Sequence, residues 1–257
     1  MRMKIKKILA FLLILTFLFS LRIVDAATTG KTRTPESYAN FRNVQAGKIG
    51  MNNLYRGQHP ANGSARSHVA NRLSKKNEIK TVLNLADSNS QLLKYFKKNK
   101  TIPTYYYRTL YDNHRVYTAS LSVKHKSSSY RKKLGASLKF MAKHNGPYLV
   151  HCNVGRDRTG FVILVLECLM GAPYSYMLDD YALSLENVNG YSRMKSRKRS
   201  AYMLNQELHY MTGKKKGTNW YKLDLVKYAE IYLRKCGMSP YEIKTLKQRL
   251  SVSYPES

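Results

Sequence analysis

The sequence is poor in acidic side chains. In 257 residues, 15 Asp and Glu stand against 45 Lys and Arg, so the formal net charge at pH 7 is +30. Such a charge raises the local concentration of anions, among them phosphorylated small molecules, anionic lipids, nucleic acids and wall polymers. General solubility would explain the same charge. Composition therefore indicates an acidic binding partner and does not identify its chemical class.

Cysteine is also scarce. The three cysteines are Cys152, Cys168 and Cys236, and a small odd number excludes a disulfide framework. Cys168 and Cys236 fall on apolar helical faces, which favours buried free thiols over a bridge between them. No pair of cysteines or histidines has the spacing of metal ligands. We therefore expect no metal and no cofactor.

Only one long apolar run is present, and it lies near the amino terminus. A basic segment, MRMKIKK, precedes a largely apolar stretch of fourteen residues from Ile8 to Leu21, and Val24-Asp25-Ala26 offers a cleavage site. The run is shorter than the ~20 residues that span a bilayer, which favours a signal peptide over residues 1–26 rather than an uncleaved anchor. Its removal takes away five basic residues and one acidic residue and leaves a net charge of +26. We expect a secreted or extracytoplasmic protein that begins near Ala27.

The rest of the chain shows no internal repeat and no domain boundary, so residues 27–257 are predicted to form a single domain. Strand patterns alternate with helix patterns, which predicts an α/β fold with a central, mostly parallel sheet of about 4–5 strands flanked by helices. The expected strands are 79–87, 104–110 and 147–151, and residues 111–120 are expected to be a polar loop. The expected helices are 64–77 (with Ser64 as N-cap), a short one around 92–96, 130–144, 159–170, 174–185 and two that close the chain, the last with a capping box at Ser239.

A basic stretch at about 188–217 interrupts these patterns. RMKSRKR, residues 193–199, holds five basic residues in seven, and Lys214, Lys215 and Lys216 follow. The composition favours a solvated insertion loop. The alternative is a patch beside the site that contacts polyanions.

The stretch VHCNVGRDRTG, residues 150–160, lies between an expected apolar strand and an expected apolar helix. A loop at a helix N-terminus presents unpaired N–H groups to an anion. Gly155 allows the turn to tighten, and Arg158 can grip two phosphate oxygens with its planar guanidinium. The same positive field favours the thiolate of Cys152, which is the nucleophilic form.

This stretch resembles the HCxxGxxRTG signature of the cysteine-dependent protein tyrosine phosphatase superfamily. The form GxDRTG is most similar to a secreted bacterial branch that includes tyrosine and dual-specificity phosphatases, lipid phosphatases and phytase-like inositol phosphatases. Similarity to that branch extends over most of residues 38–250, apart from 188–217. The matching stretches are NFRNV (40–44), LYRGQHP (54–60), IKTVLNLAD (79–87), DDYALS (179–184) and YLRKCGMSPYEIKTL (232–246).

The resemblance implies a two-step reaction without a metal. Cys152 would attack phosphorus, and water would hydrolyse the cysteinyl-phosphate. The loop residues would hold the phosphoryl group: Asn153, Val154, Gly155, Arg156, Asp157 and Arg158. Thr159 would donate a hydrogen bond to the sulfur or, alternatively, cap the helix. His151 would brace the loop and stabilise the thiolate, or be a structural histidine.

The leaving group needs a proton from an acid within hydrogen-bond reach. In the family that this sequence resembles, the acid lies on a mobile loop some tens of residues before the cysteine. Asp112 fits, since it lies forty residues before Cys152 in an expected polar loop that follows a strand. We favour Asp112 over Asp157, which could instead position water or contact substrate hydroxyls. His114 is a third candidate.

Arg156 bears on the substrate. In similar phosphatases a basic residue here contacts a second phosphate, which favours a polyanionic substrate: a phosphoprotein, a phosphoinositide or an inositol phosphate. Alternatively, Arg156 pairs with a nearby carboxylate on the surface. Arg56 would support the loop or form a structural ion pair. An anionic surface or lipid is a further candidate contact, and nucleic acid is not expected.

Two other classes of protein compete with a phosphatase. One is an inactive relative that binds anions through the same loop, and the other is a polyanion-binding surface protein that uses residues 193–216. The intact set of Cys152, Arg158 and an available aspartate favours the enzyme. A sulfurtransferase would have no need for Arg158 followed by Thr159-Gly160.

Overall fold

The computed structural model describes residues 33–98, 105–123 and 125–256. The predicted signal peptide, residues 1–26, lies outside the described residues. One compact unit spans Pro35–Ser257. Among the helices in the described ranges, none combines the length and apolar character needed to cross a membrane.

The described residues form one five-stranded sheet in the order β1-β2-β5-β3-β4. β1 (Arg42–Asn43) runs antiparallel to β2 (Leu54–Gly57), and the other three pairings are parallel. These involve β3 (Thr81–Asn84), β4 (Val116–Thr118) and β5 (Tyr148–His151). The predicted mostly parallel α/β fold is confirmed.

The register of the parallel strands brings their carboxyl ends together. His151, the last residue of β5, is level with Gly57 of β2 and Asn84 of β3, and Asn84 is level with Thr118 of β4. The loops that follow these four strands therefore meet at one edge of the sheet. In parallel α/β sheets this edge is where ligands bind.

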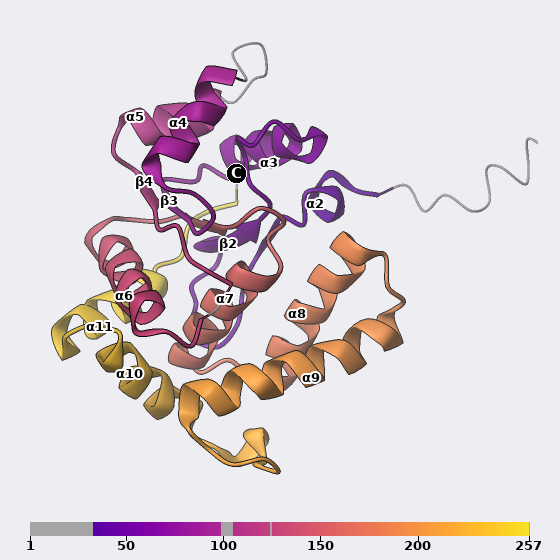
Figure 1. Ribbon diagram of the computed structural model, residues 1–257, viewed down its shortest axis with the longest axis vertical. Coiled ribbons are helices and arrows are strands. Elements are labelled where there is room, and N and C mark those ends of the chain that lie inside the picture. Colours follow the sequence, from indigo (N-terminus) through magenta and orange to yellow (C-terminus); the bar gives the residue numbers. More distant parts are fainter. Residues whose placement is uncertain (1–32, 99–104, 124, 257) are drawn as a thin grey trace, which may run out of the picture. The chain divides into compact units, whose positions relative to one another are not determined.

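Helices cover both faces of the sheet (Figure 1). Alternate residues of a strand point to opposite faces, and in β5 Leu149 belongs to one buried cluster while Val150 belongs to the other. Residues of α3, α4 and α5 pack in the Leu149 cluster, and residues of α6 to α11 pack in the Val150 cluster. The bounds are α2 Pro35–Tyr38, α3 Ala65–Lys76, α4 Asn89–Lys98, α5 Tyr105–Asp112, α6 Ser128–Lys143, α7 Asp157–Leu169, α8 Tyr174–Asn189, α9 Arg193–Thr212, the 3-10 helix η1 Trp220–Lys222, α10 Leu225–Lys235 and α11 Pro240–Leu250.

One predicted strand is wrong. Residues 105–112 form helix α5, whereas we expected a strand over 104–110. Tyrosine and threonine favour strands, but Tyr107 and Leu110 are buried three residues apart, which is a helical spacing. The edge strand β4 lies instead inside the predicted polar loop, at Val116–Thr118.

The basic stretch at 188–217 is also different from the expected loop. It folds mainly as α9, which packs along α8. Ser196 and Ser200 are buried on the α8 side, where their small size permits close approach, and the hydroxyl of Ser200 donates to the carbonyl of Leu178 at 2.7 Å. Leu204 and Leu208 continue the buried stripe.

The helix-end predictions fare better. Ser64 is the N-cap of α3, although its hydroxyl makes no capping bond, and the capping box of α11 forms between Ser239 and Glu242. Cys168 and Cys236 are buried, as their places on apolar helical faces predicted, and both are free thiols.

Candidate active site

The loop between β5 and α7 holds the predicted nucleophile. We call residues 152–158 the cysteine loop. It leaves the central strand β5 after His151 and enters α7, which begins at Asp157. Cys152 is only 3% exposed, because it lies at the start of this loop under the residues that follow.

Four successive carbonyl groups of the loop, those of residues 153–156, are bound from behind. The first accepts from the backbone N–H of His59 at 3.4 Å. The Nδ2 of Asn40 donates to the second and third at 3.0 and 3.1 Å. The guanidinium of Arg56 donates to the third and fourth at 3.0 and 3.5 Å. The polar backbone on this side of the loop is therefore occupied.

This arrangement fixes the direction of the loop amides. In a planar trans peptide, the N–H of one residue points opposite to the carbonyl of the residue before it. The N–H groups of residues 154–157 consequently point away from Asn40 and Arg56, towards the inside of the loop. Together with the N-terminus of α7, they form a cradle for an anion.

Gly155 is required by the close contact behind the loop. Its φ is +70°, and a Cβ at this position would lie 2.3 Å from the carbonyl oxygen of Gly57. Any other residue would push the loop away from β2, on which it rests.

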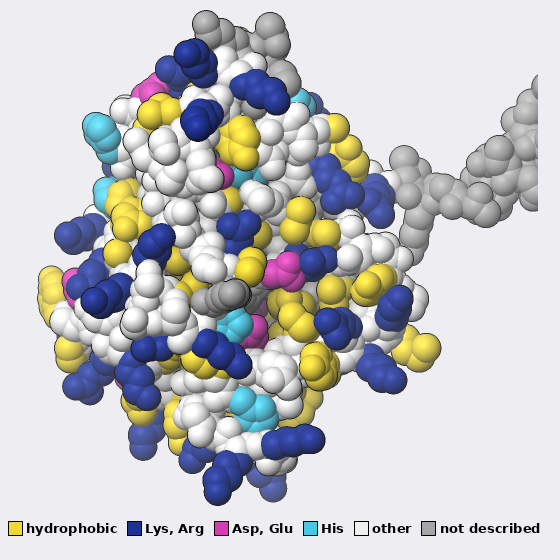
Figure 2. Space-filling view, viewed as in Figure 1, with side chains coloured by type: hydrophobic (Ala, Val, Ile, Leu, Met, Phe, Trp, Pro, Cys, Tyr) yellow, Lys and Arg dark blue, Asp and Glu magenta, His cyan; other side chains and the backbone are white. Residues whose placement is uncertain are grey.

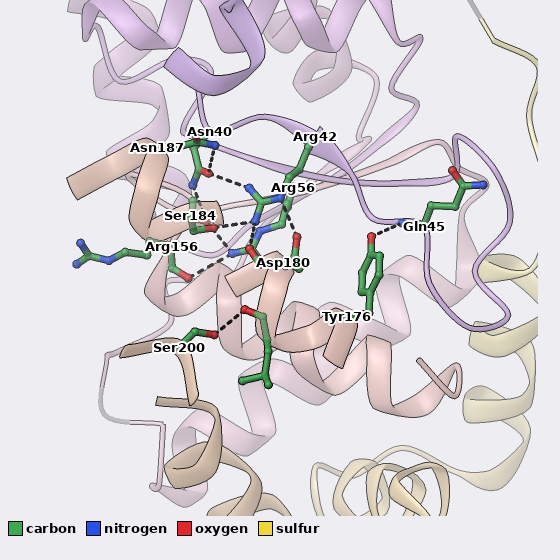
Figure 3. A network of polar contacts seen from close by, with 12 residues as sticks. Asn40, Arg42, Gln45, Arg56, Arg156, Tyr176, Asp180, Ser184, Asn187 and Ser200 are labelled. Carbon is green, nitrogen blue, oxygen red and sulfur yellow. Dashed lines mark hydrogen bonds and ion pairs between the residues drawn. The ribbon is translucent and has the colours of Figure 1, made fainter. Parts of the chain in front are cut away.

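A buried ionic network holds Arg56 in place (Figure 3). Arg42 and Arg56 converge on the carboxylate of Asp180 in α8, with Arg42 Nε 2.7 Å from Oδ1 and Arg56 Nη1 in contact with Oδ2. Burial opposes ionisation of Asp180, but the two guanidinium charges outweigh it and lower its pKa. Arg42 also donates to Oδ1 of Asn40 at 2.8 Å, so both groups that hold the loop carbonyls are themselves held.

Glu167 of α7 lies beside this network. Burial raises the pKa of this carboxyl well above its usual range, and the nearby Asp180 charge acts in the same direction. Ionisation of Glu167 is therefore disfavoured in the fold. The two arginines face one ionised aspartate and one carboxyl whose ionisation is opposed, and this balance of charge behind the loop favours an anion in front of it.

His151 braces the loop as a neutral ring. It is fully buried, and its Nδ1 donates to the carbonyl of Cys152 at 3.3 Å. Its Nε2 then accepts from the hydroxyl of Tyr107 at 2.8 Å. Burial lowers the pKa of His151 well below its ordinary value, and proximity to His59 lowers it further. Of the two roles expected for His151, the structure therefore supports bracing, and not stabilisation of a thiolate by a charged imidazole.

A second buried pair supports His151. The ring of His59 lies 4.7 Å from that of His151 and accepts at Nδ1 from the N–H of Ala61. Its Nε2 therefore carries the proton and donates to Asp87 at 2.5 Å. Burial alone would raise the pKa of Asp87, but the interactions with His59 and the hydrogen bond from Asn84 together lower it. Asp87 is thus an ionised acceptor in a structural pair.

Arg158 lies in front of the loop and is only partly buried. Its Nη1 is 3.4 Å from the carbonyl oxygens of Leu85, Ala86 and Leu121, in the loops that follow β3 and β4. Within the described residues, no carboxylate lies within ion-pairing distance of Arg158. Its charge is therefore free to bind a phosphate, since long contacts to neutral carbonyls only orient it.

Thr159 follows Arg158 in α7, and neither role expected for it is visible. Its hydroxyl is buried, and it has no hydrogen-bond partner among the described residues. The N-cap of α7 is Arg156, which makes no side-chain capping bond.

Arg156 and Asp157 pair with each other. Two guanidinium nitrogens of Arg156 lie 2.9 Å from the two carboxylate oxygens of Asp157, and a third lies 2.6 Å from Oδ1 of Asn189. The pair is at the surface, where the side chain of Asp157 is 47% exposed. Arg156 therefore pairs with a nearby carboxylate on the surface, which was the alternative to its contacting a second phosphate of the substrate.

Asp112 is not brought to the loop. It ends α5 just before β4, so it lies at the amino edge of the sheet, opposite the edge that carries Cys152. Its side chain is 56% exposed and forms a weak ion pair with Arg108 at 3.4 Å. The preference for Asp112 is corrected because the strand it was thought to follow is a helix. His114 lies before β4 as well and is excluded for the same reason.

Several supporting residues escaped the sequence analysis: Asn40, His59, Asp87, Tyr107 and Asp180. All except Tyr107 lie in the stretches NFRNV, LYRGQHP, IKTVLNLAD and DDYALS, so a signal was present without an assigned role. Tyr107 was hidden by the wrong assignment of α5. No group of three or more His, Cys, Asp or Glu side chains in the described part of the chain could hold a metal ion.

A cysteine at the end of a central parallel strand, an anion cradle and an arginine at the next helix define a class of enzymes that act on phosphate esters. Residues 35–252 match the family described as "Tyrosine phosphatase family". The chain belongs to this family, and it is therefore a phosphatase, a hydrolase of phosphate monoesters. Comparison with curated proteins finds none that matches the chain.

Proposed function

We propose that the protein is a secreted, cysteine-dependent phosphatase that hydrolyses phosphotyrosine, phosphoinositides or inositol phosphates. The observation that carries this proposal is the contrast between the two sides of the cysteine loop. The carbonyls of residues 153–156 are all bound from behind, while the amides and Arg158 face forward. Such a site fits a phosphoryl group with three equatorial oxygens.

The reaction follows from the arrangement of the groups. The thiolate of Cys152 attacks phosphorus, the S–P bond forms, and the P–O bond to the leaving group breaks. Arg158 and the amides of residues 154–157 bind the oxygens throughout. Water then attacks the cysteinyl-phosphate, releases inorganic phosphate and returns the thiolate. The amides and the α7 N-terminus stabilise that thiolate, because His151 is neutral.

The substrate is proposed to be acidic. The face of the molecule seen in Figure 2 carries many Lys and Arg side chains and few Asp and Glu. An open depression beside the loop is lined by Tyr38, Arg66 and Asn153 among others, and the guanidinium of Arg66 lies over the ring of Tyr38. This depression offers one aromatic face and one charge to the part of the substrate beyond its phosphate.

Export is part of the same proposal. A signal peptide over residues 1–26 and a single phosphatase domain over 27–257 would place the activity outside the cytoplasm. Expression of the full chain in a bacterial host tests this. We expect the protein in the medium or periplasm, with its first residue near Ala27 by amino-terminal sequencing. Recovery of the intact amino terminus in the membrane fraction would instead favour the uncleaved anchor.

The activity is tested with residues 27–257 on a phosphotyrosine peptide, phosphoinositide vesicles and inositol hexakisphosphate. We expect phosphate release by the native protein and none by Cys152→Ser. Cys236→Ala is the matched control, since burial raises the pKa of that thiol to about 11 and keeps it from acting as a nucleophile. Binding of all three anions by the native protein without release from any of them would favour the inactive, anion-binding relative.

A further inference from the structure

The loop that follows β4 reaches the active site without any carboxylate. Residues 119–127, ASLSVKHKS, contain no Asp or Glu. Asp112 is at the opposite edge of the sheet, and both oxygens of Asp157 accept from Arg156. Both oxygens of this carboxylate are thus engaged by the guanidinium. Another group beside Arg158 is therefore a candidate for donating the proton to the leaving group.

The same loop is fixed beside Arg158. The N–H of Ala119 donates to the carbonyl of Asn84 at 2.8 Å, and that of Leu121 donates to Leu85 at 2.9 Å. The carbonyl of Leu121 is in turn one of the three that orient Arg158, at 3.4 Å. The loop is thus pinned at the carboxyl edge, and His125 follows four residues later.

His125 is held by three elements. Its ring stacks on Phe161 of α7, with centroids 4.8 Å apart and planes at 23°. Tyr130 of α6 and Tyr210 of α9 meet the ring edge to face at 6.1 and 5.2 Å. On α9, Oε2 of Glu207 lies 2.7 Å from the ring Nε2, as an ion pair and not a well-aligned hydrogen bond. The carboxylate of Glu207 therefore balances the positive charge that the ring carries when it acts as an acid.

His125 and Arg158 line the same cavity. Its volume is about 180 Å³, and both side chains of the ion pair face it, with the side chain of His125 21% exposed and that of Glu207 14% exposed. The other titratable or charged groups around the cavity are Tyr130 on α6, Asp157 and Arg158 on α7, and Tyr181 on α8. Imidazole is the side chain that most readily exchanges a proton near neutral pH, and here it opens onto the space beside the phosphate-binding arginine.

We propose that His125, oriented by Glu207, is the proton donor to the leaving group; this inference rests on the proposed phosphatase function. As the S–P bond to Cys152 forms and the P–O bond breaks, the proton on Nδ1 passes to the departing oxygen, which leaves as an alcohol or phenol. The neutral ring then takes a proton from the water that attacks the cysteinyl-phosphate. Phosphate leaves, the thiolate is restored, and His125 is again protonated.

The test depends on the leaving group. A proton donor matters for a phosphate ester of an alcohol or of tyrosine, and it matters little for an aryl phosphate whose phenol is strongly acidic. We expect His125→Gln to lower kcat on a phosphotyrosine peptide by about 100-fold or more. On dinitrophenyl phosphate the same variant should retain kcat within a few-fold, and added imidazole should partly restore the peptide activity of His125→Gly.

Glu207→Gln should lower kcat on the peptide in the same selective way but less, since it keeps the shape of the side chain and removes its charge. It also provides a second test should His125→Gln fail to fold. His114→Gln is the matched control, because His114 lies at the opposite edge of the sheet, and its activity should equal that of the native protein on both substrates.

The proposal is overturned if His125→Gln keeps full activity on the peptide, or if it loses activity equally on both substrates, since an equal loss indicates a structural role. Both results differ from a failure of the phosphatase proposal itself, in which the native protein would release phosphate from neither substrate.

Discussion

Arg56, behind the cysteine loop, and Arg158, at the end of the loop, differ in what surrounds them. Arg56 is completely buried, paired with Asp180 and bonded to loop carbonyls. Arg158 is partly buried and has only long contacts to neutral carbonyls. The charge of Arg56 is neutralised by Asp180 while its guanidinium shapes the loop, whereas the charge of Arg158 remains available to a ligand. Arg158 can bind a phosphate because other residues hold the loop in place.

The largest effect should come from the arginine in front of the loop. Arg158→Lys keeps the charge but loses the planar, two-pronged grip. We expect kcat/KM on a phosphotyrosine peptide to fall about 100- to 1,000-fold, with the midpoint of thermal unfolding almost unchanged. Steady-state kinetics and a melting curve on the same sample provide the check. If Arg158→Lys lowered the thermal stability as much as the activity, Arg158 would have a structural role like that of Arg56.

Removing the charge behind the loop should act on stability first. Asp180→Asn leaves Arg42 and Arg56 buried without their carboxylate, which costs about 3–5 kcal/mol. The neighbouring Asp179→Asn is the matched control, since Asp179 is more exposed and bridges surface arginines of α9, and it should cost at most about 1 kcal/mol. Urea unfolding measures both. Similar costs for the two variants would contradict the structural role of Asp180.

Two glycines allow the effect of the close contact between the loop and β2 to be separated from the effect of backbone strain. Gly155 and Gly213 have φ values of +70° and +69°, but only Gly155 has atoms where a Cβ would lie. Gly213→Ala should cost about 1–2 kcal/mol from backbone strain alone. Gly155→Ala should cost more and should also lower kcat, because the loop must move off the carbonyl of Gly57. Equal changes in the free energy of unfolding would show that the close approach does not matter.

The smallest effect concerns Glu167, and it depends on pH. Because the folded protein raises the pKa of this carboxyl, its contribution to stability is complete below the unfolded pKa and is lost as pH rises through the folded pKa. Glu167→Gln stays neutral at every pH. We expect it to gain about 1 kcal/mol over the native protein between pH 5 and pH 8. A stability difference that is constant across this range would mean that Glu167 is ionised in the fold.

The centre of the sheet and the cysteine loop could be predicted from the sequence, because the patterns that determine them lie close together in the chain. The apolar strand before Cys152, the glycine at 155 and the apolar helix after Arg158 each have a clear pattern, and the loop depends on all three. The edge of the sheet was harder. Helix α5 is rich in tyrosine and threonine, and its burial of Tyr107 against His151 decides its structure more than residue preference does.

That error also displaced the predicted acid. Asp112 was selected by its distance along the chain from Cys152, but whether it precedes or follows an edge strand decides at which end of the sheet it lies. His125 could not have been found in this way, since its surroundings come from α6, α7 and α9. The ion pair with Glu207 joins residues that are 82 positions apart in the sequence. No local sequence pattern predicts such a pair.

The most direct measurement is to trap the intermediate. Residues 27–257 are mixed with a phosphotyrosine peptide, quenched in acid within milliseconds and digested, and the peptide that contains Cys152 is examined by mass spectrometry. We expect this peptide to gain one phosphoryl group in the native protein and none in Cys152→Ser. A phosphoryl group on another residue, or phosphate release that continues in Cys152→Ser, would contradict this expectation.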